Sequence, residues 1–397
     1  MAVTMMTRRL VLALAACLCA GRNCPAQHST WYKGNLHTHS YWSDGDEFPE
    51  MIMDWYKGRG YNFVALSDHN ILALGEKWIK VTHSKMYEDG FQAYLAKFGK
   101  AVTYHNDSGR MQVKLKTYAE YKPLFEDAGF LIIRSEEVTD KFQGKPIHMN
   151  VTNVDQLISP QGGTSVADVI QRTIDAVLQQ RKETGVPMFS HINHPNFFYS
   201  ISLQDIISLH GERFFEVYNG HPLVNNYGDS LHPGTEQMWD KINMAYLKKK
   251  QPLMYGLATD DSHNYHQFGS AFSNAGRGWV MVKAEALTPA ALIKALEAGD
   301  FYASTGVELL ELKTERKTIS IKVKAEPGVD YQIHFIGASK KDEQMHELKV
   351  VTGIEGSLTL SSDQLYVRVK ITSSKLKANP FRDGEYEAAW TQPMKGD

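Results

Sequence analysis

The chain has 397 residues, 43% of them hydrophobic, so it is long enough for one large domain with a small one and can bury a sizeable core. Its formal net charge is −2 and it has no long basic run, which argues against a protein that grips a nucleic-acid polymer through many phosphates. A small phosphorylated substrate remains compatible with this charge if bound metals supply the positive charge.

The N-terminal segment, residues 1–26, has the pattern of an export signal. Arg8 and Arg9 precede an apolar run at residues 10–20, which is too short to span a bilayer. All three cysteines fall in this segment, so cleavage after Ala26 leaves a mature chain without thiols. Leu14-Ala-Ala-Cys17 also resembles a bacterial lipoprotein signal, which makes a lipid anchor on Cys17 the alternative, and a retained anchor is a third. We expect an exported protein, periplasmic or secreted.

Short apolar strands alternate with amphipathic helices from residue 31 to about residue 305. This alternation predicts βα units in a parallel sheet or barrel. Within it, Ser165 and Gly185 bracket an apolar stripe at helical spacing, which predicts a helix over residues 166–183. Further elements are expected as strands at 62–66 and 186–190, a helix that begins at Pro49 and stops by Gly60, and a helix from Thr288-Pro289 to Gly299.

The pattern changes after Gly306. Residues 318–324, 331–335 and 365–371 alternate apolar and polar side chains with period two, which predicts a small antiparallel β-sandwich over residues 307–397. Residues 27–306 would then form the α/β domain. Residues 75–128 are polar and aromatic-rich, and we interpret them as an insertion, a candidate lid.

Clusters of metal-ligand residues follow the apolar strands. In an α/β barrel the carboxyl ends of the strands converge on the face where active sites form. Imidazole and carboxylate together suit zinc, manganese or iron. Each element alone is more often structural, but six at strand ends in one βα series favour a metal centre. The elements are His37-Thr-His39 with Asp44, Asp68-His69, Glu136-Glu137, His148, His191 with His194, and Asp261-Ser-His263.

These motifs, in this order, resemble the metal-binding motifs of the polymerase and histidinol phosphatase (PHP) family over residues 31–305. The helix that ends in Ala-Leu-Glu-Ala-Gly-Asp-Phe-Tyr-Ala-Ser is similar to the branch that includes carbaryl-type hydrolases. The resemblance implies a distorted (β/α)7 TIM-like barrel and a site of two to three divalent ions, usually zinc, manganese or iron. The ligands it implies are His37, His39, Asp44, His69, Glu137, His148, His194, Asp261 and His263.

The sequence offers alternatives at three positions of this set. Glu137 is preferred to Glu136 because the family's glutamate precedes an apolar residue and threonine, as in Glu137-Val-Thr139. His194 is preferred to His191 because the family motif is His-Pro. Asp44 stands where some relatives have histidine, so the identity of the metal there is open.

Other polar residues are candidates for contact with substrate. Arg277, between Gly276 and Gly278, is a candidate phosphate clamp, with a solvated loop arginine as the alternative. His221 and His266 lie beyond ligand motifs and are candidate substrate contacts, otherwise surface histidines. Asp68 is expected to orient a ligand or close a turn, and Asp260 to lie behind the ligands.

We therefore expect a metal-dependent hydrolase of small molecules, foremost a phosphomono- or phosphodiesterase. A hydroxide that bridges the metals would attack phosphorus, positioned by Asp261 or by a histidine such as His194. The first alternative is an ester, carbamate or amide hydrolase of the carbaryl type. The second is a non-catalytic, metal-dependent binding module. The sequence does not indicate an oligomeric state.

Overall fold

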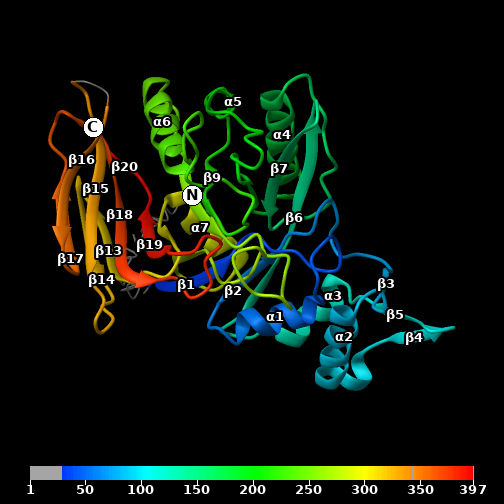
Figure 1. Cartoon of the computed structure of the whole chain (residues 1–397). Coiled ribbons are helices and arrows are strands. Elements are labelled where there is room, and N and C mark those ends of the chain that lie inside the picture. Colours follow the sequence, from blue (N-terminus) through cyan, green and yellow to red (C-terminus); the bar gives the residue numbers. More distant parts are fainter. Residues whose placement is uncertain (1–28, 342–343, 397) are drawn as a thin grey trace, which may run out of the picture.

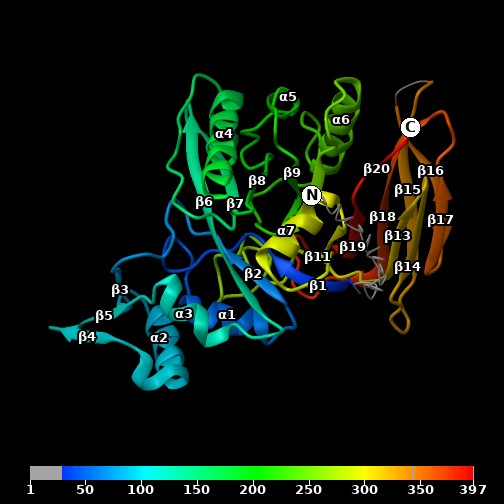
Figure 2. The same ribbon diagram turned by 180° about the vertical axis from the view of Figure 1, so that it is seen from behind.

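The computed structural model describes residues 29–341 and 344–396. The predicted export segment, with Cys17, lies outside the described residues. Among the described helices, none is both long and apolar enough to cross a membrane. Figures 1 and 2 show a central α/β body, with a small insertion at one end and the C-terminal strands at the opposite end.

Seven strands of the α/β body lie side by side in the order β10-β9-β8-β7-β6-β2-β1. Most neighbours are parallel, as predicted for βα units. β7 is an exception and runs antiparallel to β6 and β8. Its link to β6 is the two-residue turn Gln143-Gly144, in which both residues have positive φ, and such a turn joins antiparallel strands only. The strands are β1 (Thr30–Asn35), β2 (Phe63–Leu66), β6 (Leu131–Phe142), β7 (Lys145–Thr152), β8 (Phe189–Ile192), β9 (Phe214–Asn219) and β10 (Tyr255–Thr259).

The outer strands β1 and β10 approach each other just beyond their ends. Thr38 forms a parallel bridge with Ser262, and the His39 N–H donates to the Ser262 carbonyl at 2.9 Å. The named strands themselves form an open path. The closed (β/α)7 barrel therefore stays a prediction, while the mixed α/β architecture is confirmed.

The helix expected over residues 166–183 begins and ends at the caps that the sequence predicts. The Ser165 hydroxyl accepts from the Asp168 N–H at the start of α4 (Val166–Thr184), and Gly185 ends it in the left-handed region at φ 69°, as predicted. The apolar side of α4 packs on Met149 of β7 and Ile192 of β8. The other helices of the body are α1 (Pro49–Lys57), α5 (Leu203–Ile207), α6 (Thr235–Lys248) and α7 (Pro289–Ala298).

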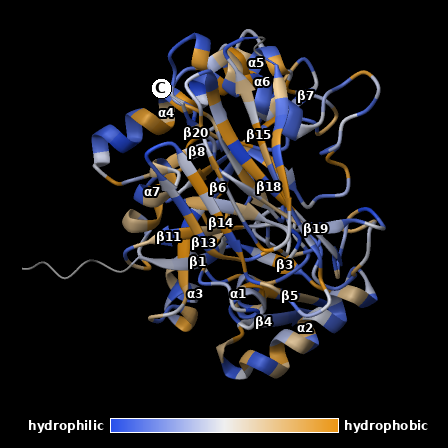
Figure 3. Ribbon diagram, turned by 90° about the vertical axis from the view of Figure 1, so that its left-hand side faces the viewer, coloured by the Kyte–Doolittle hydropathy of each residue, from blue (hydrophilic) through white to orange (hydrophobic). Residues whose placement is uncertain are grey.

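The C-terminal part consists of antiparallel strands in two sheets, as the period-two pattern predicts. Ile319 and Ile321 of one sheet pack against Phe335 and Val369 of the other, and apolar and polar residues alternate along β15 and β18 (Figure 3). One sheet is β13 (Leu309–Glu315), β14 (Thr318–Val323) and β17 (Glu355–Thr359); the other contains β15 (Tyr331–Ser339), β16 (Met345–Thr352), β18 (Gln364–Leu376), β19 (Tyr386–Thr391) and β20 (Met394–Lys395).

The second of these sheets is continuous with the α/β body. β19 pairs with β12 (Phe301–Ser304), β12 with β11 (Trp279–Ala284), and β11 with β1. The predicted boundary at residue 306 therefore falls between two strands of one hydrogen-bonded sheet, because β12 on its N-terminal side pairs with β19 on its C-terminal side.

The insertion forms a three-stranded sheet with flanking helices. It packs on α1 through aromatic residues, with the rings of Phe48 and Tyr94 stacked at 4.0 Å. Its elements are β3 (Trp78–Lys80), α2 (Lys85–Phe98), the 3₁₀ helix Gly99–Ala101, β4 (Tyr104–Asp107), β5 (Arg110–Lys114) and α3 (Tyr118–Phe125).

Candidate metal centre

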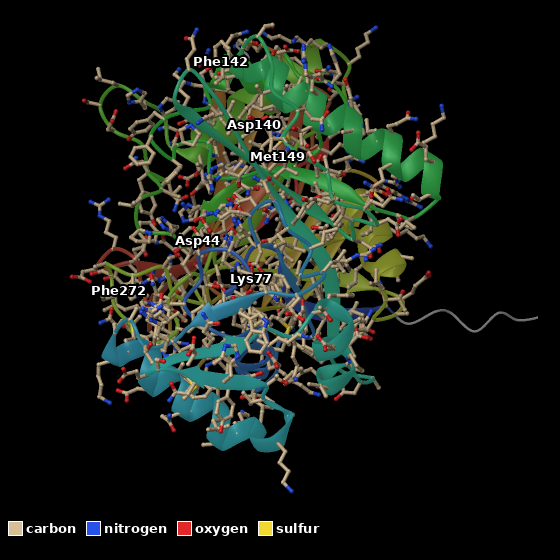
Figure 4. The ribbon with its side chains drawn as sticks, turned by 90° about the vertical axis from the view of Figure 1, so that its right-hand side faces the viewer. Asp44, Lys77, Asp140, Phe142, Met149 and Phe272 are labelled. Atoms are coloured by element: carbon tan, nitrogen blue, oxygen red, sulfur yellow. The ribbon has the colours of Figure 1, made fainter. Side chains whose placement is uncertain are left out.

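The nine sequence-predicted ligands come together around one cavity. In the view with side chains drawn, Asp44 lies between the strands of the body and the insertion (Figure 4). The structure places these ligands on the loops and strands that carry them as follows: His37 and His39 after β1, Asp44 in the next turn, His69 after β2, Glu137 on β6, His148 on β7, His194 after β8, and Asp261 and His263 after β10.

The most buried group has the spacing of a metal shell. His37 Nε2 lies 3.1 Å from His39 Nε2, and Asp261 Oδ1 lies 3.2 and 3.3 Å from these two nitrogens. Glu137 Oε1 lies 3.4 Å from His37 Nε2, and its Oε2 lies 3.3 Å from His39 Nε2. A tetrahedral ion with bonds of about 2.0–2.1 Å keeps its ligand atoms about 3.3 Å apart. Imidazole nitrogens lie near the buried Glu137 Oε2, but none forms a hydrogen bond with it, so this oxygen is an acceptor that a cation would satisfy.

Glu137 also belongs to a second group. Its Oε1 lies 3.1 Å from His148 Nδ1 and 3.5 Å from His194 Nε2, and its Oε2 lies 2.9 Å from His69 Nδ1. One carboxylate therefore faces two neighbouring sets of imidazoles, which is the arrangement of a ligand shared between adjacent ions.

The third group surrounds Asp44. Its carboxylate lies 3.4 Å from His263 Nε2, 3.5 Å from His69 Nε2 and 3.7 Å from His39 Nδ1. These four residues can jointly hold an ion. The Asp44 side chain is 57% exposed, so this third position is the one most open to solvent.

The charges of the cluster favour a cation. Burial and the neighbouring His263 and His69 lower the pKa of His39 to about 3, so His39 is neutral and has a free lone pair. Burial opposes ionisation of Glu137 and Asp261, but the surrounding imidazoles outweigh it and hold both pKa values well below the ordinary range. Burial likewise disfavours protonation of His37, yet Asp261, Glu216 and Glu137 together raise its pKa. The carboxylates that raise the pKa of His37 would equally attract a metal ion, which would replace the proton on this imidazole, because neutral imidazole and ionised carboxylate are the forms that bind metal.

Two of the ligands sit on strained backbone. His194 has φ of 24° and Asp261 has φ of 49°, in the region where residues other than glycine cost energy. Asp261 is held there by its own N–H, which donates to the His37 carbonyl at 3.0 Å, and His194 by its N–H, which donates to Glu216 Oε2 at 2.8 Å. The surrounding fold therefore fixes the directions of both side chains.

Sequence reasoning missed Glu216. This glutamate of β9 is fully buried and accepts hydrogen bonds from the Asn219 amide at 2.8 Å and the Thr259 hydroxyl at 2.7 Å, besides those from His37 and His194. The signal was present as a single carboxylate in the apolar run Phe-Phe-Glu-Val-Tyr, which a strand buried on both faces has no packing reason to contain.

His191 and His194, the two candidates after β8, have different surroundings. His194 lines the cavity. His191 is wholly buried behind it, with Nε2 3.5 Å from Glu216 Oε1, and neither of its ring nitrogens has a hydrogen-bond partner. Glu136 points away from the site and accepts from the Ile158 N–H at 2.7 Å, which agrees with the preference for Glu137.

The cavity has a volume of about 190 Å³. Its lining contains no lysine and no arginine, and none of the insertion residues 75–128. His221 is part of the lining, and its Nδ1 accepts the Leu223 N–H at 3.1 Å. In neutral His221 the proton is therefore on Nε2, which makes that atom a hydrogen-bond donor. The lining residues are Asp44, His69, Glu137, His148, His194, Phe197, His221, Leu223, Asp261 and His263.

The other two predicted substrate contacts lie away from this cavity. Arg277 is 1% exposed, and its guanidinium donates to main-chain carbonyls including those of Gly220, Gly269 and Asn379. Its donors connect several loops in this structure and are therefore not free to clamp a phosphate. His266 Nε2 bonds the Asp46 carbonyl at 2.8 Å, so it too has a structural contact.

Asp68 and Asp260 support the ligand loops. Asp68 accepts from the N–H and hydroxyl groups of Ser40 and Ser43, which closes the turn that carries Asp44. Asp260 accepts from the N–H groups of residues 276–278 and from the Asn35 amide. Both carboxylates are therefore occupied in holding loops.

Comparisons with known proteins add little to this geometry. No protein-family model matches the chain, and no relative is found among curated proteins. A two-domain protein from Bacteroides vulgatus, described as containing a predicted PHP-like metal-dependent phosphoesterase, is 14% identical with a TM-score of 0.41, over 92% of this chain and 95% of that one. A proposed metal-dependent phosphoesterase from Bifidobacterium adolescentis is 11% identical with a TM-score of 0.29, and the match covers 59% of this chain and 88% of that one. An amidohydrolase from Chromobacterium violaceum, with bound sulfate and no metal, is 13% identical with a TM-score of 0.28, and the match covers 58% of this chain and 87% of that one. At TM-scores below 0.5 these likenesses do not establish a shared fold.

Proposed function

We propose that this protein is a metal-dependent hydrolase of the PHP type, with a distorted (β/α)7 barrel, and that it cleaves phosphomonoesters or phosphodiesters. The observation that carries the proposal is the cluster of nine histidine, aspartate and glutamate side chains, seven of which line one cavity while the buried His37 and His39 lie behind it, with Glu137 facing two groups of imidazoles. The order of their motifs along the chain supports the same assignment.

We infer three possible ion positions from the contacts. His37, His39, Glu137 and Asp261 would hold the first ion, Glu137 with His148 and His194 the second, and Asp44 with His69 and His263 the third. Divalent zinc, manganese or iron, if bound at such positions, would lower the pKa of a bound water and polarise an ester or phosphoryl oxygen.

The charge of the ligand set bears on the substrate. Three divalent ions outweigh the carboxylates of Asp44, Glu137 and Asp261 by three charges, whereas two ions outweigh them by one. A phosphoryl group that carries two negative charges suits the first case, and an uncharged ester suits the second. Occupancy of the Asp44 position therefore bears on which class of ester the site prefers.

The chain's own groups would supply orientation and a hydrogen-bond donor. The cavity lining has no hydroxyl, thiol or amine side chain, and its carboxylates and all its imidazoles except that of His221 are assigned to the metals, so water would be the attacking group. Asp261, whose Oδ2 accepts from the Asn219 amide at 3.1 Å, and His194 are fixed by the backbone and orient that water. The Nε2–H of His221 is placed to donate to the leaving oxygen or to a phosphoryl oxygen.

The test is a hydrolysis screen on metal-loaded protein with four substrate classes side by side: phosphomonoesters, phosphodiesters, carboxyl esters and carbamates. We expect turnover of a phosphoester that depends on added metal and is abolished in His37→Ala and Asp261→Ala. His210→Ala, remote from the cavity, is the matched control. A fully metallated protein that turns over none of the four classes would contradict the proposal.

A second candidate is hydrolysis of an ester, carbamate or amide, as in carbaryl-type hydrolases. The specific observation in its favour is the wall of Phe197 and Leu223 in a cavity without lysine or arginine. Turnover of carbamates or carboxyl esters but of no phosphoester in the same screen would favour this candidate.

We also propose that the protein is exported, through the segment 1–26, as a periplasmic, secreted or Cys17-anchored form. The N-terminal pattern is the support. Mass spectrometry of the N-terminus should find cleavage after Ala26 or before Cys17, and an intact Met1 on cytosolic protein would contradict export.

A further inference from the structure

An apolar strip leads from the metal cavity to the surface. We define the apolar lip as Phe197, Phe198 and Leu223. Phe197 and Leu223 line the cavity, and the ring of Phe198 contacts that of Phe197 at 4.5 Å. Phe198 is 68% exposed and Leu223 is 58% exposed. Water thus meets three large apolar side chains at the mouth of an otherwise charged site.

The backbone holds this exposed phenylalanine at a cost. Phe198 and Tyr199 have φ of 52° and 51°, two consecutive non-glycine residues in the left-handed region. Nothing is gained by burial, because Phe198 stays largely in solvent. Strain of this kind persists only where the surroundings enforce it, and it gathers at functional sites.

The surroundings do enforce it. The Asn196 amide donates to the carbonyls of Asn225 and Pro233 at 2.9 Å each, and Phe197 forms a β-bridge with Val224. These contacts fasten the loop after His194 to the loop that carries Leu223. The lip is therefore a built surface in which two loops present one continuous apolar strip.

The absence of cationic side chains from the cavity lining also favours an uncharged group at the mouth of the cavity. The cavity lining has no lysine or arginine, and the guanidinium of Arg277 is engaged with carbonyls elsewhere. A leaving group with charges of its own, such as a nucleotide or a sugar phosphate, would find no cationic side chain in this lining to pair with. An uncharged apolar group would find a matching surface.

We propose that the apolar lip is the seat of the leaving group, and that the preferred substrates carry an uncharged apolar leaving group that lies along Phe197, Leu223 and Phe198. This inference rests on the proposed hydrolase function. The lip covers only one face of such a group, so each added methylene loses about half of its water contact.

The test is a series of n-alkyl phosphates, from methyl to hexyl, with metal-loaded full-length protein. A fully buried methylene is worth about a fourfold factor and a half-buried one about twofold, so kcat/KM should rise by roughly 10- to 30-fold along the series. In the Phe198→Ser/Leu223→Ser variant the rise should fall to about threefold or less. Leu310→Ser/Leu376→Ser is the matched control, at leucines of the C-terminal strands that are 56% and 54% exposed, and it should keep the full rise in kcat/KM.

A binding measurement separates this inference from the proposed function. Calorimetry with methylphosphonate and hexylphosphonate, which are not hydrolysed, should give the same chain-length preference and the same loss in the double variant. Equal kcat/KM for methyl and hexyl phosphate would overturn the seat and leave the hydrolase function standing. If no ester is turned over, the hydrolase proposal fails, and equal affinities for the two phosphonates would overturn the seat independently.

Discussion

The imidazole of His37 is held by the carboxylate of Glu216, with Nδ1 at 2.7 Å from Oε1. Burial alone would raise the pKa of Glu216, but the adjacent His37 and His191 outweigh it and lower that pKa below its ordinary value. An ionised carboxylate only accepts, so the Nδ1–H of His37 donates to it, and Nε2 is the atom that faces the cluster and would bind a metal ion in place of a proton. A carboxylate behind a ligand histidine fixes its tautomer and ring orientation.

Glu216→Gln should therefore weaken metal binding by about 10- to 100-fold. The glutamine amide can donate to Nδ1 and thereby favour the wrong tautomer, while the shape of the side chain is kept. Metal affinity measured by competition with a chelator is the readout. Glu212→Gln is the control, because this buried glutamate lies in the same region and bonds Ser190 and main-chain N–H groups instead. Unchanged affinity in Glu216→Gln would contradict the positioning role.

Asp44→Ala should cost one metal equivalent and leave the others in place. Its carboxylate contacts only the third group, of His39, His69 and His263. Glu137→Gln should lose more than one equivalent, since Glu137 faces two groups. Elemental analysis of both variants beside the wild type measures this, and equal metal loss in the two would refute the shared-ligand assignment.

The C-terminal strands should prove necessary for stability of the α/β body. Arg368 of β18 forms a buried two-pronged ion pair with Asp240 of α6, at 2.7 and 2.8 Å. Arg368→Ala should lower the free energy of unfolding by about 3–5 kcal/mol, because Asp240 is left buried and unpaired. Arg368→Met/Asp240→Leu should recover most of this loss. In a chain that ends at residue 306, β12 also lacks its partner β19, so this truncated protein should unfold at a lower temperature. If thermal melts show the truncated protein to be as stable as the full chain, the C-terminal strands are not needed for stability.

Lys377 should make stability depend on pH in alkaline solution. Burial is the main cause that lowers its pKa from 10.5 to about 8, and Glu385 only partly opposes it. The folded state disfavours the charged form of Lys377. The resulting loss of stability is therefore complete below pH 8 and disappears as the pH rises to about 10.5, where the lysine is neutral in both states. The free energy of unfolding should rise by up to about 3 kcal/mol over this window relative to Lys377→Met. Denaturant titrations at several pH values measure it, with exposed Lys141→Met as the control. A difference that does not change with pH would argue against the buried cation.

Phe198→Asn should stabilise the protein. Asparagine tolerates the left-handed conformation better than phenylalanine, and little apolar burial is lost, so the gain is about 0.5–1 kcal/mol. Thermal unfolding of the metal-free protein is the readout. The same variant should bind hexylphosphonate more weakly than the wild type does. A loss of stability would indicate that Phe198 is a packing residue and not a strained functional one.

The sequence by itself determined the ligand types and several local elements. Glycine and hydroxyl caps set the ends of α4, and period-two alternation gave the C-terminal strands, because both depend on neighbours along the chain. The candidate metal motifs could be recognised for the same reason, since they are short segments within a strand or just beyond its end. The antiparallel β7 was missed because the two-residue turn at Gln143 was not recognised as the link between two strands.

Only the tertiary structure decided which groups meet. In the tertiary structure Glu216 lies behind His37, 179 positions away in the sequence. Arg277 lies away from the cavity and donates to carbonyls of three loops. The tertiary structure also joins the C-terminal strands to the body through β12 and β19. Sequence patterns report the face on which a side chain lies, whereas hydrogen-bond partners, burial and charge neighbours depend on how distant segments pack. That is why the sequence could suggest a candidate ligand set, whereas the residues that orient its side chains were found only in the tertiary structure.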